Sequence, residues 1–448
     1  MNLLNKYKFE LLIIFIQLIE PISLIGLILG SIYIFYIIAF KSKFDLVSVF
    51  ILLIPSIALG YRFENIEYYS NPEISTNWIK LYLPAVKTVY LLGPIAISIP
   101  FVAAIAVPFR LILFFRNNCN KILVIIWFLV LIISIIGLVL AIIKNQVSTG
   151  GLTVGLRIAL SIGAILFPLS VNGSQFERQL MIIIKISVVL FLFGLLNGLW
   201  KFVFFAFPTY LVFSNENKGW KILGFISLII ILFFDFTFTL KITALFSFFL
   251  LLYYKKEKLR NLFLNFRKLK YLAFLFPILI VIFLVYSNLF IKISDYNLFS
   301  DKFVIKLLDD RVPIWTYSLD LVLNSNFFLV PAARDITVYN YTTLGEDSWG
   351  HGAHNIYLEM ARQLGLFATL LITYIIAYIL FKSIYKIKGN LNLSKFLLSL
   401  FAVYVVWSLT GNALVYDGTG FLFWLIIGQI YQSGTFYKKQ IFQKINRI

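Results

Sequence analysis

The chain has two histidines, and they lie three residues apart in the stretch WGHGAHNIYLEMARQLG, as His351 and His354. Imidazole is the side chain best suited to proton transfer near neutral pH, so this stretch is the first candidate for acid–base chemistry. The spacing would also suit a metal, but Cys119 is the single cysteine and no third histidine exists, so a metal would need carboxylate ligands. We expect neither a metal nor a cofactor. The alternative for His354 is that it caps the following helix, which starts near Asn355; capping does not exclude catalysis.

Two arginines in the preceding stretch could bind an anion. Arg311 lies in LDDRVPIWTYSLDLVL, where Pro313 favours the start of a helix. A guanidinium among the free N–H groups of a helix start is well placed to hold a pyrophosphate. The alternative is a local ion pair with Asp309 or Asp310. Arg334 is a second candidate cation.

A third cation interrupts an apolar segment. Lys241 lies in FTFTLKITALFSFF, and an ionisable group in such a segment is a functional candidate. Alternatively its long side chain extends to the membrane surface, with Asp235 as a possible partner. Lys185, in MIIIKISVVLF, is open to the same two interpretations.

The composition indicates a membrane protein. Of the 448 residues, 61% are hydrophobic and 13% are charged, against about a quarter charged in soluble domains. The net charge of +19 would suggest nucleic acid binding in a soluble protein. Here we assign it to Lys and Arg that flank membrane segments on the cytoplasmic side.

Apolar stretches of the length needed to cross a membrane, about 20 residues, recur along the chain. We predict an all-α helical bundle with about 12 transmembrane helices, within a range of about 11 to 14. Residues 9–40 are too long for one upright helix, so they form either two short passes, separated at Glu20-Pro21, or one tilted pass. Residues 201–214 could form a half-pass. The predicted spans lie near 44–60, 88–109, 122–143, 153–171, 180–198, 220–236, 240–254, 271–290, 364–382, 396–412 and 418–433.

The distribution of charge predicts the orientation. Residues 255–270 hold seven basic residues and one acidic residue, and basic residues also mark the N-terminus, residues 382–395 and the C-terminal tail. All four regions are expected in the cytoplasm. Residues 292–354 hold eight acids and five bases, a net of about −3, and the pass count places them outside. We therefore expect an N-terminal bundle at 1–290, a large periplasmic loop with short helices at 291–362, and C-terminal transmembrane helices with a cytoplasmic tail at 363–448.

Several motifs resemble the O-antigen ligase/polymerase superfamily of bacterial membrane glycosyltransferases. Arg311 and Trp315 form an Arg-x3-Trp pair early in the outer loop, and His354 opens a His-Asn-x-Tyr-Leu motif that contains Asn355 and Tyr357. Residues 213–217 (FSNEN) and 239–241 (TLK) are similar to two further family stretches. The chain departs from the family at Lys241, where an arginine is usual, and in lacking a Pro-x-Gly-x-Gly stretch.

The resemblance implies transfer of a glycan from undecaprenyl pyrophosphate at the periplasmic face of the bacterial inner membrane, without a metal. His354 would be the general base, and Arg311 and Lys241 would bind the donor pyrophosphate. The further substrate-binding residues that we predict are Trp315, Arg334, His351, Asn355 and Tyr357. The expected partners are lipid-linked donor and acceptor oligosaccharides, membrane lipids and a chain-length regulator protein, with no nucleic acid.

Three functions fit these features to different degrees. A polymerase, which adds the growing chain to another lipid-linked repeat unit of O-antigen or capsule, is the preferred one. A ligase, which adds the finished glycan to lipid A–core, is the first alternative. A flippase or transporter of lipid-linked oligosaccharides would show charges and broken helices at mid-membrane in two related halves, and no such repeat is found.

Overall fold

Helices make up 90% of the residues that the computed structural model describes, so the protein belongs to the all-α class, as predicted. The described residues are 3–19, 22–58, 89–92, 95–114, 120–143, 151–167, 171–193, 206–233, 238–254, 315, 355–386, 391–410 and 417–445. The N-terminal elements are α1 (Leu3–Lys6), α2 (Lys8–Leu18), α3 (Ser23–Ala39), α4 (Leu46–Ala58), β1 (Val89–Leu92), β2 (Ile95–Ser98), α7 (Ile99–Leu113), α8 (Lys121–Ile143), α9 (Gly151–Ile162) and the 3₁₀ turn η2 (Gly163–Leu166). The remaining helices are α10 (Gly173–Phe193), α11 (Phe207–Phe213), α12 (Lys218–Phe233), α13 (Phe238–Tyr254), α19 (Ile356–Leu364), α20 (Leu366–Lys386), α21 (Leu391–Thr410) and α22 (Asp417–Ile445).

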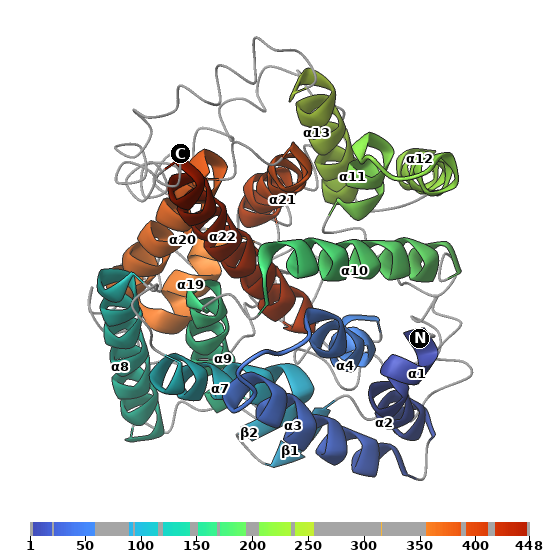
Figure 1. Cartoon of the computed structure of the whole chain (residues 1–448). Coiled ribbons are helices and arrows are strands. Elements are labelled where there is room, and N and C mark those ends of the chain that lie inside the picture. Colours follow the sequence, from blue (N-terminus) through green and yellow to red (C-terminus); the bar gives the residue numbers. More distant parts are fainter. Residues whose placement is uncertain are drawn as a thin grey trace, which may run out of the picture.

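Helix α22 is the centre of this arrangement. It crosses the middle of the molecule in Figure 1 and packs against α4, α7, α9, η2, α10, α20 and α21. The side chains of its residues 418–433 are all buried. Gly428 allows the closest approach, because a Cβ at this position would lie 2.5 Å from the carbonyl oxygen of Ile165 in η2. The predicted span 418–433 is therefore the buried core of the bundle.

The predicted span 88–109 is wrong in its first part. Residues Val89–Leu92 and Ile95–Ser98 form an antiparallel hairpin, in which Val89 pairs with Ser98, and α7 starts only at Ile99. The sequence between the strands is Gly93-Pro94, a pair typical of turns. Ser98 then caps α7, because its Oγ accepts a hydrogen bond from the N–H of Phe101 at 3.2 Å.

The predicted number of passes stays a prediction. Two helices of the described residues are both long and apolar enough to cross a membrane, within Lys121–Leu140 and Leu366–Ser383. Shorter apolar helices occur in α3, α4, α7, α13 and α21, and in the segment Gly155–Leu166. The break predicted in 9–40 as one of two alternatives is confirmed, since α2 ends at Leu18 and α3 starts at Ser23, and the half-pass predicted at 201–214 contains the seven-residue α11. The predicted span 271–290 lies outside the described residues.

Helix α2 buries two polar residues and exposes several large apolar ones. Its buried residues include Glu10 and Gln17, whereas Phe9 is exposed and Phe15 is 61% exposed. Glu10 accepts a hydrogen bond from the hydroxyl of Tyr33 on α3 at 3.3 Å. Soluble helices bury the apolar stripe and expose the polar one.

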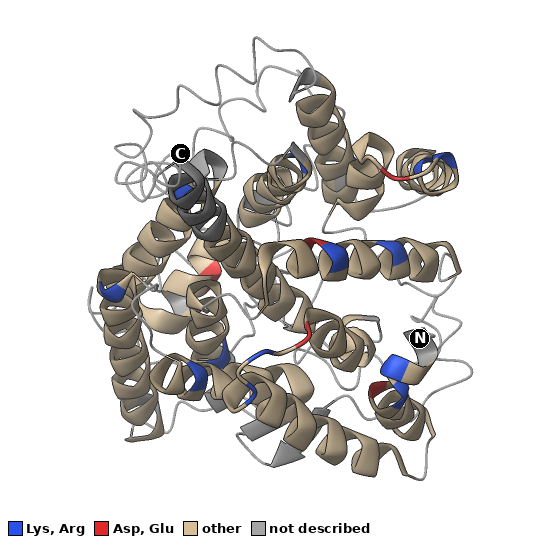
Figure 2. Ribbon diagram, in the orientation of Figure 1, with Lys and Arg blue, Asp and Glu red and all other residues tan. Residues whose placement is uncertain are grey.

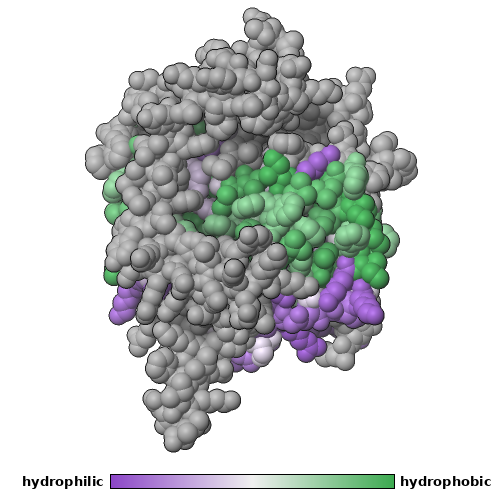
Figure 3. Space-filling view, turned by 90° about the horizontal axis from the view of Figure 1, so that it is seen from above, coloured by the Kyte–Doolittle hydropathy of each residue, from purple (hydrophilic) through white to green (hydrophobic). Residues whose placement is uncertain are grey.

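Other peripheral helices also expose large apolar side chains. Ile125 on α8 is 66% exposed, Phe225 on α12 is 50% exposed and Phe249 on α13 is 59% exposed. Figure 3 shows one face of the molecule, where hydrophobic residues form a broad area bordered by hydrophilic ones. Charged residues are sparse on the described helices in Figure 2. Contiguous apolar surface of this extent is rare on soluble monomers.

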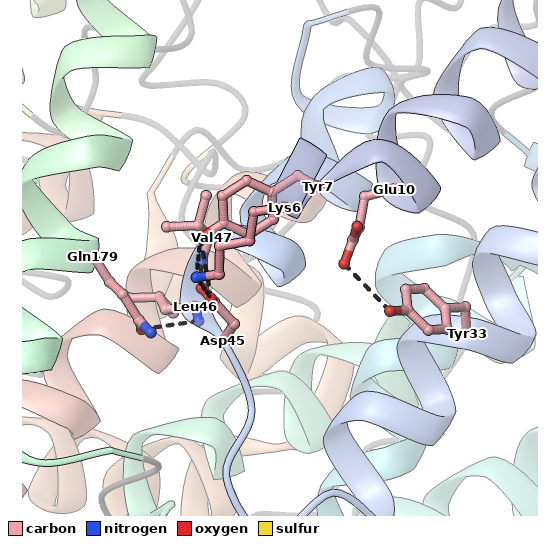
Figure 4. A network of polar contacts seen from close by, with 8 residues as sticks. All are labelled: Lys6, Tyr7, Glu10, Tyr33, Asp45, Leu46, Val47 and Gln179. Atoms are coloured by element: carbon pink, nitrogen blue, oxygen red, sulfur yellow. Dashed lines mark hydrogen bonds and ion pairs between the residues drawn. The ribbon is translucent and has the colours of Figure 1, made fainter. Parts of the chain in front are cut away.

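A network of hydrogen bonds and one ion pair connects the N-terminal residues Lys6 and Tyr7 to the start of α4 (Figure 4). The ammonium of Lys6 lies 2.5 Å from a carboxylate oxygen of Asp45, which also accepts a hydrogen bond from the hydroxyl of Tyr7 at 3.0 Å. The other oxygen of Asp45 accepts from the N–H of Val47 at 3.0 Å and so caps α4. Gln179 of α10 accepts from the N–H of the first α4 residue at 3.1 Å. Three distant segments therefore meet at one helix start.

A buried arginine donates hydrogen bonds at the C-terminal end of α3. Arg110 of α7 donates to the carbonyl oxygens of Ile38 and Lys41 at 3.0 and 2.9 Å, and to that of Ser42 at 3.3 Å. Its guanidinium also lies 4.5 Å from the ring centroid of Phe44. These carbonyls lie at and just beyond the last turn of α3, where no intrahelical donors remain. The planar fork of Arg110 satisfies several of them at once.

We predict that Arg110→Lys destabilises the protein by about 2 kcal/mol, because one ammonium cannot replace a fork that reaches three carbonyls. The measurement is the thermal unfolding midpoint of the full chain in detergent. Arg178→Lys, at an exposed position of α10, is the matched control and should leave the midpoint unchanged. Equal midpoints for the two variants would contradict the capping role of Arg110.

Candidate functional site

The histidine motif is described by the structure from Asn355, at the start of α19. Asn355 is the N-cap of this helix, and its side-chain oxygen accepts hydrogen bonds from the N–H groups of Tyr357 and Leu358 at 3.0 and 3.2 Å. Asparagine is among the strongest N-cap residues because its side chain replaces the missing backbone acceptors. The capping role considered for His354 is therefore filled by Asn355, the next residue in the sequence.

Helix α19 is short, and all its side chains that the structure describes are buried. It packs against α8, α9, α20 and α21, and its polar residues Glu359 and Gln363 are as buried as its apolar ones. The side-chain amide of Gln363 donates to the carboxylate of Glu359 at 3.4 Å. The helix ends at Gly365, whose φ of 89° lies in the region that favours glycine, and α20 starts at the next residue. Both ends of α19 are thus fixed in place.

A pair of tyrosine hydroxyls joins the first turn of α19 to α21. The hydroxyl of Tyr357 donates to that of Tyr404 at 2.9 Å, whereas Ser408, one turn further along α21, donates its hydroxyl to the carbonyl oxygen of Val405 at 3.1 Å. Burial raises the pKa of Tyr357 to about 12, although hydrogen bonding opposes the shift. Tyr357 is therefore a neutral hydroxyl at physiological pH and does not act as a base.

The ring of Tyr404 connects α21 to the central helix. It stacks near Phe423, with ring centroids 6.5 Å apart, and lies edge-on to Trp424 at 6.2 Å. Both partners belong to α22. The first turn of α19 is therefore connected, through two tyrosines, to the buried part of α22.

Within residues 292–354, the structure describes Trp315. This residue has helical conformation, is 6% exposed and belongs to the main hydrophobic core. The helix start predicted around Pro313 lies outside the described residues. Because its side chain is largely buried, Trp315 anchors this part of the loop against the bundle; its contact with substrate stays a prediction.

Lys241 lies in the first turn of α13 and is partly buried. Helix α13 packs extensively along α21, which also contacts α19. Lys241 makes no ion pair within the described part of the chain, and Asp235, its predicted partner, lies outside it. Lys241 and Tyr357 are thus on two helices that share α21 as a neighbour, and no described interaction joins them directly.

Lys185 has a structural partner that the sequence did not indicate. Its ammonium lies 2.8 Å from a carboxylate oxygen of Glu216 and 5.1 Å from the ring centroid of Trp220. Glu216 belongs to the connection between α11 and α12, which resembles a family stretch, and Asn217 in this connection caps α12 by accepting from the N–H of Trp220 at 3.1 Å. Lys185 therefore ties α10 to this connection.

Four of the predicted site residues lie outside the described residues: Arg311, Arg334, His351 and His354. Four others are described. Trp315, Asn355 and Tyr357 are buried, and Lys241 is partly buried. The residues that the sequence did not predict are Tyr404 and Ser408. A signal existed, because a tyrosine and a serine four residues apart in an apolar helix are neighbours on one face.

Known protein families, characterised proteins and solved structures give no match to this chain. The resemblance to the O-antigen superfamily therefore rests on the motifs themselves. Of these, the Asn-x-Tyr-Leu part of the histidine motif has a defined structure, in which Asn355 caps α19 and Tyr357 bonds to α21.

Proposed function

We propose that the protein is a metal-independent membrane glycosyltransferase that polymerises undecaprenyl-pyrophosphate-linked repeat units of O-antigen or capsule. The reaction takes place at the periplasmic face of the bacterial inner membrane. The observation that carries the proposal is the buried, doubly fixed start of α19, because His354 immediately precedes its cap in the sequence. A general base must be held within hydrogen-bond reach of its substrate, so a rigid attachment is what the reaction requires.

The distribution of apolar side chains supports a location in the membrane. Peripheral helices expose large apolar residues, and α2 buries Glu10 and Gln17 while Phe15 is 61% exposed. Contact with lipid tails is favourable for exposed apolar side chains, whereas contact with water is unfavourable. The two long apolar helices α8 and α20 agree with this location. In this proposal the bundle has about 12 membrane passes, and residues 292–354 lie outside.

The proposed reaction is a displacement at the anomeric carbon of the donor sugar. His354 takes the proton from an acceptor hydroxyl, and the hydroxyl oxygen forms the new glycosidic bond. The bond from the anomeric carbon to the pyrophosphate oxygen breaks, and undecaprenyl pyrophosphate leaves with the electron pair. Arg311 and Lys241 neutralise the charge that develops on the leaving group. No redox partner is needed.

The lipopolysaccharide of a host strain lacking this gene tests the proposal. A core that carries a single repeat unit supports a polymerase. A bare core would replace it by the ligase alternative, and repeat units trapped inside the cell would replace it by the flippase. A wild-type ladder together with an unchanged capsule would contradict all three.

We further predict that Arg311→Ala weakens binding of the lipid-pyrophosphate donor at least about tenfold, because a charge-assisted contact to phosphate is lost. Binding is measured by titrating the lipid-linked repeat unit into purified protein in nanodiscs. Arg260→Ala, in the predicted cytoplasmic loop, is the control. Unchanged donor affinity in the Arg311 variant would contradict its role in pyrophosphate binding.

A further inference from the structure

The hydroxyl cluster of Tyr357, Tyr404 and Ser408 is unusual for its surroundings. Tyr404 and Ser408 lie one turn apart on α21 in the apolar sequence LFAVYVVWS, and both are buried. Tyr404 accepts a hydrogen bond from the hydroxyl of Tyr357, which is 2% exposed, and Ser408 donates to the carbonyl oxygen of Val405 in its own helix. Burying a hydroxyl in apolar surroundings is unfavourable unless it is hydrogen-bonded. The hydroxyls of Tyr357 and Tyr404 therefore satisfy each other between α19 and α21.

A hydrogen bond between two helices restricts their relative position more narrowly than apolar contacts do. Packing of aliphatic side chains is non-directional, so a short helix among apolar neighbours could rotate or slide at small cost. A hydrogen bond needs a narrow range of distance and angle. The bond of 2.9 Å to Tyr404 thus fixes both the rotation of α19 and its height along α21. Asn355 then fixes the conformation of the backbone where the chain enters α19.

We propose that Tyr404 is a positioning residue for the transfer reaction. It holds the first turn of α19, and thereby the point at which the outer loop joins the bundle. This inference rests on the proposed function, because that loop carries the proposed general base. Tyr404 does not touch substrate. Its loss misplaces the base relative to the acceptor hydroxyl, while the cations that bind the donor pyrophosphate belong to other segments.

The test is Tyr404→Phe in the full-length protein in nanodiscs, with the lipid-linked repeat unit as substrate. This change removes the acceptor for Tyr357 and keeps the ring against Phe423 and Trp424. We expect kcat to fall at least about tenfold, since small misplacements of catalytic groups have effects of this size, while the donor KM changes less than about twofold. Hydrogen exchange at the N–H groups of Tyr357 and Leu358 should become faster.

Tyr210→Phe is the matched control. Tyr210 on α11 is also buried and also packs against α21, through Phe396, but its hydroxyl makes no hydrogen bond within the described residues. This variant should retain wild-type kcat and wild-type exchange in α19. The double variant Tyr357→Phe with Tyr404→Phe should lose no more activity than Tyr357→Phe alone, because both changes remove the same bond.

Three outcomes would overturn the inference. In the first, Tyr404→Phe has the same kcat as Tyr210→Phe. In the second, Tyr404→Phe loses activity mainly through a higher KM for the donor. In the third, Tyr404→Phe shows faster hydrogen exchange in α19 without any fall in kcat. A failure of the proposed function looks different, because the wild-type protein itself would then form no polymer.

Discussion

Replacing His354 by alanine is expected to abolish polymer formation while the amount of protein in the membrane stays at the wild-type level. A positioned general base contributes about 10²- to 10⁴-fold to the rate, so the loss should reduce the O-antigen ladder to core plus one repeat unit. The fold should persist, because Asn355 and not His354 caps α19. The ladder is read on a lipopolysaccharide gel, and the protein level by immunoblot of the same membranes.

His351→Ala is the matched control for this experiment, since it removes the other imidazole of the same stretch. We predicted a substrate-binding role for His351, so its loss should weaken polymerisation without abolishing it. An unaltered ladder in the His354 variant would contradict its role as the base. Loss of the protein from the membrane would instead indicate a structural role.

Replacing Gly428 by alanine is expected to destabilise the protein strongly, because the added methyl group would clash with the backbone of a neighbouring element. The added Cβ would lie 2.5 Å from the oxygen and 2.8 Å from the carbon of the Ile165 carbonyl, and 2.9 Å from the oxygen of Ala164. These are backbone atoms of η2, which cannot rotate away as a flexible side chain does. Overpacking of this kind costs about 1–3 kcal/mol or more. Alanine otherwise favours a helix over glycine by about 1 kcal/mol, and the steric clash should outweigh this gain.

The thermal unfolding midpoint in detergent measures the effect. Gly219→Ala, also in a helix, is the control: its nearest contact would be the side-chain oxygen of Asn217 at 3.6 Å, an ordinary van der Waals distance. That variant should have the same midpoint as the wild type or a slightly higher one. If Gly428→Ala unfolds at the same temperature as Gly219→Ala, α22 does not pack closely on η2.

Much of the local structure followed from the sequence. Long apolar stretches predicted an all-α protein, and the break in residues 9–40 was placed near Glu20-Pro21, where α2 and α3 are separate helices. The start of α19 near Asn355 was also predicted, because capping depends on residues within one turn of each other. These features depend on neighbours in the sequence, so residue types and spacing are sufficient to predict them.

Other features required the tertiary structure. Helix α8 and residues 421–427 of α22 are both apolar all round, so no periodic pattern distinguishes the outward helix from the central one. The ion pair of Lys185 with Glu216 and the hydroxyl bond of Tyr357 with Tyr404 join residues that are 31 and 47 positions apart. The sequence alone determined which residue types could do chemistry and where helices begin. The packing of distant helices decided which polar side chains meet, because only in the folded bundle does a buried hydroxyl or charge find its partner.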